Sequence, residues 1–136
     1  MIVVDTNALV DSLQPGPRHG AMQEVLLRHP RWSAPRLWRS EFRNYLAKEM
    51  RRGVLGMDQA LELVTRAEVL LGEGEYDVPT PAVLDLCRRS RCTAYDAEFV
   101  VLALALGVPL VTGDRGILRA FPGIAVAPEA FAAGAR

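Results

Sequence analysis

Three residue types that often carry protein chemistry are scarce in this chain. Cysteine and histidine each occur twice in 136 residues, and Lys48 is the only lysine. Cys87 and Cys92 lie five positions apart, without a CxxC spacing or a nearby histidine pair, which argues against a zinc site and a disulfide framework. We therefore expect free thiols. A Gly-rich phosphate-binding loop with its lysine is also missing, which excludes the P-loop class.

Excess charge and long apolar runs are missing as well. The chain has 16 basic and 16 acidic side chains, so no overall field would attract a polyanion, and any nucleic-acid contact must be local. The longest apolar run, residues 99–106, is far shorter than a membrane span. Only three apolar residues lie between Met1 and Asp5, which leaves no room for a secretory leader. We expect a soluble, cytoplasmic protein without a membrane partner.

The segments that are present alternate between extended and helical patterns. Half of the residues are hydrophobic, enough for one domain over residues 1–136. Strands are predicted at 2–4, 32–34, 76–78, 108–111 and 124–126, and the longer helices at 37–52, 61–71, 82–89 and 94–106. Right-handed crossovers between such strands produce parallel pairing. The sequence therefore predicts an α/β fold, a three-layer α/β/α sandwich with a central, mainly parallel sheet.

Two aspartates follow predicted strands. Asp5 comes directly after Val4, and Asp114 follows Val111 by three residues. Each has a plain structural alternative as a turn or helix-capping residue. The carboxyl ends of parallel strands meet at one edge of the sheet, where ligands usually bind. The two carboxylates are therefore expected at the same edge.

Two further acids lie on predicted helices. Asp96 begins a helix that is apolar on every side, so its start should lie near the sheet edge. Its structural alternative is a capping box with Thr93. Glu41 lacks a helical ion-pair partner and lies within or beside an apolar stripe, where an uncompensated carboxylate costs several kcal/mol. Glu49, in contrast, has Arg52 three residues later and is assigned to a solvated face.

Gathered together, these acids would repel one another unless a cation bound them. Oxygen ligands without histidine or cysteine favour Mg²⁺ or Mn²⁺ over zinc. Metal ions held in this way hydrolyse phosphodiester bonds by activating water and neutralising the phosphate. Such a site needs no nucleophilic side chain. The candidate catalytic and metal-binding residues are Asp5, Glu41, Asp96 and Asp114.

At these residues the chain resembles the PIN-domain family, particularly the VapC toxins of bacterial toxin-antitoxin pairs. The matching motifs, in order, are Val-Val-Asp-Thr-Asn at Asp5, Ser-Glu-Phe at Glu41, Ala-Tyr-Asp-Ala-Glu-Phe-Val-Val-Leu-Ala at Asp96 and Leu-Val-Thr-Gly-Asp at Asp114. Each motif is short, but four of them in this order cover almost the whole chain.

The resemblance implies a Mg²⁺- or Mn²⁺-dependent endoribonuclease that forms a homodimer and is inhibited by a small antitoxin protein. It also implies supporting roles for Thr6, Asn7 and Thr112. Many relatives carry a further acidic or polar residue where this chain has Ile117, which leaves the number of metal ions open. Glu98 is a minor candidate, because two positions from Asp96 it should face elsewhere on the helix.

A possible RNA-binding surface consists of Arg88, Arg89 and Arg91, with a solvated basic cluster or a dimer contact as alternatives. The rival functions are a catalytically weak PIN-fold interaction module and an aspartate-based phosphatase. A phosphatase would need a lysine near the acids, and Lys48 lies late in the Glu41 helix. The first motif of such a phosphatase would also need a second aspartate, which the motif at Asp5 lacks.

Overall fold

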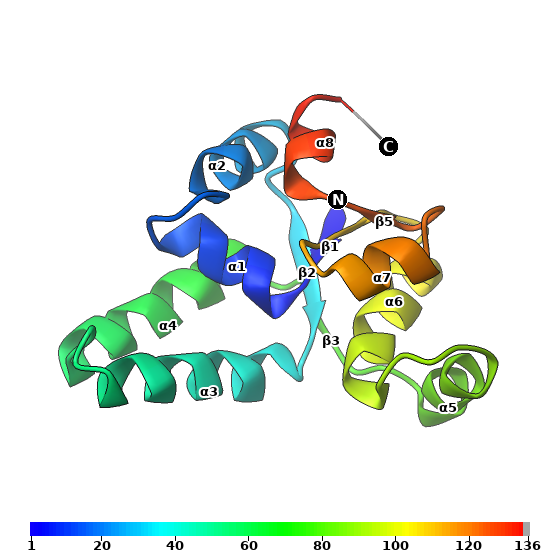
Figure 1. Cartoon of the computed structure of the whole chain (residues 1–136), viewed down its shortest axis with the longest axis horizontal. Helices are drawn as coiled ribbons and strands as arrows, with labels where there is room; N and C mark the ends of the chain where they lie inside the picture. Colours follow the sequence, from blue (N-terminus) through cyan, green and yellow to red (C-terminus); the bar gives the residue numbers. More distant parts are fainter. Residues whose placement is uncertain (135–136) are drawn as a thin grey trace.

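A five-stranded parallel sheet forms the centre of the computed structural model, which describes residues 1–134 (Figure 1). The strand order is β3-β2-β1-β4-β5, so the first strand is the middle one. Val3 of β1 pairs with Ser33 on one side and Leu110 on the other. The strand bounds are β1 Ile2–Val4, β2 Trp32–Pro35, β3 Glu75–Tyr76, β4 Leu110–Val111 and β5 Ala125–Val126.

Helices cover both faces of this sheet. Figure 1 shows α1, α2 and α4 on one side and α5, α6 and α7 on the other, while α3 runs outward and pairs with α4. The predicted three-layer α/β/α sandwich is thus confirmed. The helix bounds are α1 Thr6–Leu13, α2 His19–Arg28, α3 Trp38–Arg51, α4 Met57–Leu71, α5 Thr80–Arg89, α6 Ala94–Leu106, α7 Arg115–Ala120 and α8 Pro128–Ala132.

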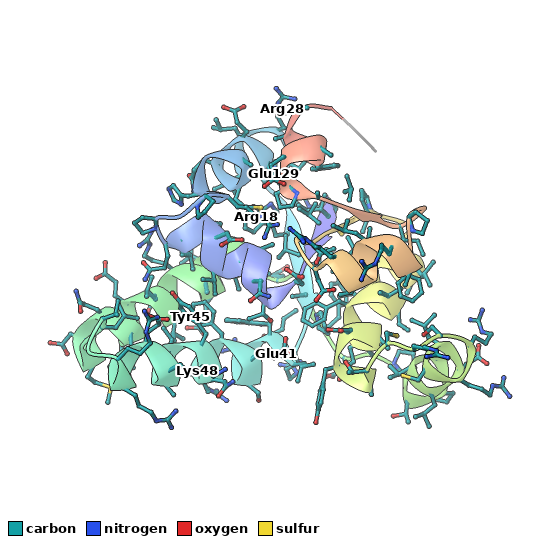
Figure 2. The ribbon with its side chains drawn as sticks, in the orientation of Figure 1. Arg18, Arg28, Glu41, Tyr45, Lys48 and Glu129 are labelled. Carbon is teal, nitrogen blue, oxygen red and sulfur yellow. The ribbon has the colours of Figure 1, made fainter. Side chains whose placement is uncertain are left out.

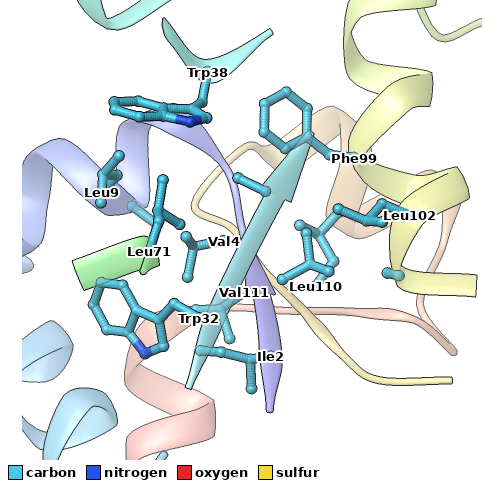
Figure 3. Packing of buried hydrophobic residues seen from close by; sticks show 14 of the residues in the cluster. Ile2, Val4, Leu9, Trp32, Trp38, Leu71, Phe99, Leu102, Leu110 and Val111 are labelled. Atoms are coloured by element: carbon cyan, nitrogen blue, oxygen red, sulfur yellow. The ribbon is translucent and has the colours of Figure 1, made fainter. Parts of the chain in front are cut away.

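One hydrophobic core extends across both faces of the sheet. Leu9, Leu71 and Trp32 pack on one side of the central strands, and Phe99 and Leu102 pack on the other (Figure 3). Helix α6 lies against β1, β2 and β4, which explains why its sequence is apolar on every side. This packing holds the start of α6 beside the ends of the central strands.

The expected elements differ from the observed ones mainly at the strand bounds and at the start of one helix, because α4 begins at Met57 instead of 61. The third strand is Glu75–Tyr76 instead of 76–78, because its pairing with β2 runs from the Gly74 carbonyl to the Tyr76 carbonyl. The fourth strand is reduced to Leu110–Val111. Helix α6 has the predicted bounds and ends at Gly107, whose positive φ of 67° suits glycine. Among residues 1–134, no helix combines the length and apolar character needed to cross a membrane.

Candidate active site

The strand order changes direction between β1 and β4, and two of the predicted acids follow these two strands. In open parallel sheets, the crevice for ligands forms outside the carboxyl ends of the strands at this kind of switch point. Asp5 is the N-cap residue of α1 and Asp114 the N-cap residue of α7. The topology therefore places both carboxylates on the two sides of the crevice.

Asp5 is buried, and hydrogen bonds hold both of its carboxylate oxygens. Oδ1 accepts from the backbone N–H of Ala8 at 2.8 Å, and Oδ2 accepts from the hydroxyl of Thr112. The fully buried Thr112 Oγ1 also accepts from the backbone N–H of Asp114 at 3.0 Å. One threonine hydroxyl thus joins the two strand-end aspartates, and Asp5 has the capping contact proposed as its structural alternative.

The other two aspartates also take part in capping. Asp114 Oδ1 accepts from the backbone N–H of Ile117 at 2.9 Å, which caps α7. The backbone N–H of Asp96 donates to Thr93 Oγ1 at 3.1 Å, as a cap by Thr93 requires. Capping does not exclude ligand binding, because a carboxylate has further lone pairs and the helix N-terminus favours its ionised form.

Glu41 lies one turn into α3 and points toward the start of α1 (Figure 2). The hydroxyl of Thr6 donates to Glu41 Oε1 at 2.7 Å. The expectation that Glu41 faces the core therefore needs a correction. Its side chain is half-buried in the wall of a hollow, where a neutral hydroxyl compensates part of its lost hydration. The local sequence contains no partner because the partner is 35 residues away.

Burial and mutual repulsion make ionisation costly in this cluster. Burial raises the pKa of Asp5 to about 6, and the charges of Asp114 and Glu41 add to the increase, although hydrogen bonds from Thr112 and Ala8 oppose it. Burial and the nearby Asp114 charge likewise raise the pKa of Asp96. No basic group is among the causes of these shifts, so a cation at this place would remove a real electrostatic cost.

All four acids line one hollow of about 280 Å³. The complete lining consists of Asp5, Thr6, Asn7, Glu41, Asn44, Tyr45, Lys48, Asp96, Phe99 and Asp114. Within residues 1–134, no three acidic, histidine or cysteine side chains converge closely enough to form a finished metal site. The donors nevertheless fit Mg²⁺ or Mn²⁺, because they are hard oxygens and Mg²⁺ keeps several waters when only one or two carboxylates bind it.

The sequence did not single out four residues of this lining as site residues. Asn44, Tyr45 and Lys48 follow Glu41 by three, four and seven positions, a spacing that places them on one face of α3. This spacing is the feature of the sequence that could have identified the three residues as neighbours of Glu41. Lys48 was interpreted as remote from the acids, and this interpretation is wrong because Lys48 lies on the rim of their hollow. Phe99 forms part of the floor from α6.

The remaining predicted residues fall into two groups. Asn7 lines the hollow, whereas the predicted arginine surface lies outside it. Arg88 and Arg89 both pair with Asp85 on α5, and Arg91 is exposed near the start of α6. Glu98 does not line the hollow, although burial and the charge of Glu41 raise its pKa. A surface partly neutralised by Asp85 is a weaker phosphate site than the three positive charges alone indicated.

The hydrogen bond between Thr6 and Glu41 leads to a prediction. Thr6→Val removes the donor with little change in volume, so the Glu41 carboxylate should lose its fixed orientation. For the nuclease activity that the family resemblance implies, RNA cleavage should fall about 10- to 100-fold, as is typical when a group that orients a metal-site carboxylate is lost. Thr65→Val, on the exposed side of α4, is the control, and cleavage rates under single-turnover conditions are the measurement. Equal rates for both variants would contradict the role of Thr6.

The family comparison matches residues 2–122 to the PIN domain. A relative named Ribonuclease VapC1, from Mycobacterium tuberculosis, is 31% identical over 122 residues, which are 90% of this chain and 91% of the relative. The same figures hold for the strains CDC 1551 / Oshkosh and ATCC 25618 / H37Rv. Both similarities therefore extend over nearly the whole chain.

Solved structures share the fold at lower identity. PAE2754 from Pyrobaculum aerophilum superposes with a TM-score of 0.77 at 22% identity, over 97% of this chain and 86% of that one. FitAcB from Neisseria gonorrhoeae superposes with a TM-score of 0.68 at 21% identity, over 94% of this chain and 98% of that one. A toxin-antitoxin complex from Klebsiella pneumoniae superposes with a TM-score of 0.64 at 17% identity, again over 94% of this chain and 98% of that one. By its matched residues, its identity to a ribonuclease and its fold, this chain belongs to the PIN domain family.

Proposed function

We propose that this chain is a Mg²⁺- or Mn²⁺-dependent endoribonuclease that acts as one nuclease domain. The observation that carries the proposal is the hollow at the switch point of the sheet, which four carboxylates from four separate parts of a PIN-family chain line. The 31% identical relative, named a ribonuclease, supports RNA as the substrate.

Each residue has a role in this proposal. Asp5, Asp96 and Asp114 would hold the metal ion, and Glu41 would be the fourth acid, facing the attacking water or a second ion. When bound, the metal would supply activated water and charge neutralisation at the phosphate. Thr112 orients Asp5 and the backbone before Asp114, Thr6 orients Glu41, and Asn7 offers a neutral polar group at the mouth of the hollow.

The test is cleavage of single-stranded RNA by the purified protein. We expect cleavage with Mg²⁺ or Mn²⁺, none in excess chelator, and recovery when the metal is added back. Asp96→Asn should abolish cleavage and leave the circular dichroism spectrum unchanged, because Asn keeps the backbone N–H that donates to the Thr93 cap. Calorimetric titration of Mn²⁺ into the wild type gives the number of ions. Full cleavage in chelator would refute the proposal.

We further propose the toxin role, with a small antitoxin as partner and a homodimer as the active form. Support comes from the name of the 31% identical relative and from fold neighbours solved as a toxin-antitoxin complex and as FitAB bound to DNA. Expression of the chain alone should arrest growth, and co-expression of a short neighbouring reading frame should relieve the arrest. Light scattering tests the dimer. Growth arrest by Asp96→Asn would show that toxicity does not come from cleavage.

A catalytically weak interaction module is the alternative from another class, and it predicts antitoxin binding without RNA cleavage. The phosphatase alternative keeps one argument in its favour, because Lys48 does lie at the acidic hollow. Hydrolysis of p-nitrophenyl phosphate, measured beside RNA cleavage, separates these three functions. The family membership favours the nuclease.

A further inference from the structure

The four-carboxylate hollow poses an electrostatic problem for a polyanionic substrate. RNA must approach a group of acids, and the chain as a whole has no net charge to attract it. A bound metal ion compensates the acids at the reacting phosphate, but the neighbouring phosphates of the strand need cations of the protein. The basic side chains nearest the hollow are therefore the ones to consider.

Lys48 is the one basic side chain in the lining of the hollow. It is exposed, and within residues 1–134 it takes part in no ion pair. Several arginines elsewhere are engaged by carboxylates: Arg39 by Glu68 and Glu75, Arg52 by Glu49, and Arg88 and Arg89 by Asp85. The arginines without such a partner do not line the hollow. Lys48 thus has its charge available where the substrate would lie.

The distance of Lys48 from Glu41 indicates which phosphate it would meet. Seven residues of α-helix correspond to about 10 Å along the axis, on the same face. Lys48 is therefore too far along α3 to share the reacting phosphate with Glu41, but it can reach a phosphate further along the strand. Its flexible stem and compact ammonium group suit such a point contact.

Tyr45 comes between the two in the sequence of α3 and lines the same hollow. Its ring packs against Phe42, with centroids 6.2 Å apart, and Phe42 packs edge-on against Trp38 at 5.7 Å. The indole N–H of Trp38 in turn donates to Glu75 at 2.7 Å. This series of contacts holds the half-buried Tyr45 ring in place, so stacking a base on it would cost little additional ordering.

We propose that the Tyr45–Lys48 turn of α3 is an RNA subsite next to the reacting phosphate, a proposal that rests on the nuclease function described above. Lys48 binds the phosphate of a neighbouring nucleotide, and Tyr45 stacks on that nucleotide's base. The substrate strand then runs outward along α3, away from the arginines of α5. Single-stranded RNA is the matching substrate, because a paired base could not stack on a side chain in this way.

The test separates binding from cleavage. In an Asp96→Asn background, the Kd of a fluorescein-labelled single-stranded RNA is measured by anisotropy over a range of salt concentrations with Mg²⁺ present. Lys48→Ala should weaken binding about tenfold at low salt and reduce the slope of log K against log salt by about 0.7. Lys48→Arg should keep most of the affinity. Arg66→Ala, which removes an equal exposed charge from α4, should change neither quantity.

Tyr45 is tested in the same assay. Tyr45→Leu should weaken binding about fivefold or more, whereas Tyr45→Phe should bind like the parent because the ring is retained. If Lys48→Ala matches Arg66→Ala while the wild type still cleaves RNA, the subsite is refuted and the nuclease function stands. If the wild-type protein neither binds nor cleaves RNA, both are refuted. Equal binding by Tyr45→Leu and Tyr45→Phe would exclude stacking.

Discussion

Replacing Asp5 with asparagine is expected to abolish RNA cleavage and, at the same time, to stabilise the metal-free protein at neutral and higher pH. Cleavage should fall at least about a thousandfold, because several kcal/mol of transition-state stabilisation depend on the metal that Asp5 is proposed to hold. The stability gain has a separate origin. In the metal-free protein, the buried Asp5 carboxylate lies near Asp114 and Glu41 and is costly to ionise.

The direction of the pH dependence follows from the raised pKa. Asp5 has a pKa of about 6 in the folded protein and 3.8 as its ordinary value, so between these values the folded state binds a proton that the unfolded state releases. Asp5 therefore lowers stability as the pH rises from about 4 to 6, by a total on the order of 3 kcal/mol. Asparagine carries no charge at any of these pH values. Its advantage should be absent near pH 4 and complete at pH 8.

Urea unfolding in EDTA at pH 4, 6 and 8 measures this effect. Asp58→Asn is the control, because Asp58 lies exposed in the first turn of α4 and should show no such gain with pH. Mg²⁺ should stabilise the wild type at pH 8 and have little effect on Asp5→Asn, since a ligand stabilises only the state that binds it. An Asp5→Asn protein less stable than the wild type at pH 8 in EDTA would contradict the electrostatic explanation.

Gly74→Ala is expected to have the largest effect on folding of any single methyl group added to this chain's glycines. A Cβ at Gly74 would overlap the carbonyl oxygen of Trp32 and would lie 2.9 Å from the Leu71 carbonyl oxygen and 3.1 Å from Ser33 Cα. All three atoms are backbone, so no side-chain rotation can relieve the overlap. Strands β2 and β3 would have to separate, which should cost about 3 kcal/mol or more.

Thermal unfolding followed by circular dichroism checks this expectation. The matched control is Gly20→Ala inside α2, where an added Cβ meets nothing within 4 Å. There alanine should be neutral or stabilise by up to about 1 kcal/mol, because it favours helix and restricts the unfolded chain. Because β2 leads into α3, Gly74→Ala should also disturb Glu41 and reduce cleavage. Similar melting temperatures for the two variants would show that the β2–β3 junction is not rigid.

The sequence predicted the layers of the fold and the four acids that the structure brings to one hollow. Strand and helix patterns follow local periodicity, and the short buried run before Asp5 is sufficient to place that residue at a strand end. Parallel pairing then brings Asp114 to the same edge without knowledge of any side-chain contact. The bounds of α6 were predictable because a threonine cap and a glycine stop lie in the sequence itself.

Only the tertiary structure decided what surrounds those acids. Glu41 has a hydrogen-bond partner 35 residues away in Thr6, and Asp5 has one 107 residues away in Thr112. The carboxyl group of Asp85, which pairs with both Arg88 and Arg89, lies nearby in sequence, but only the structure shows that both guanidinium groups turn toward it. Lys48 lies at the hollow because α3 packs beside α1, whose first residues line the hollow as well. Local pattern gives the face of a helix, whereas the element that the face meets is set by packing between distant segments.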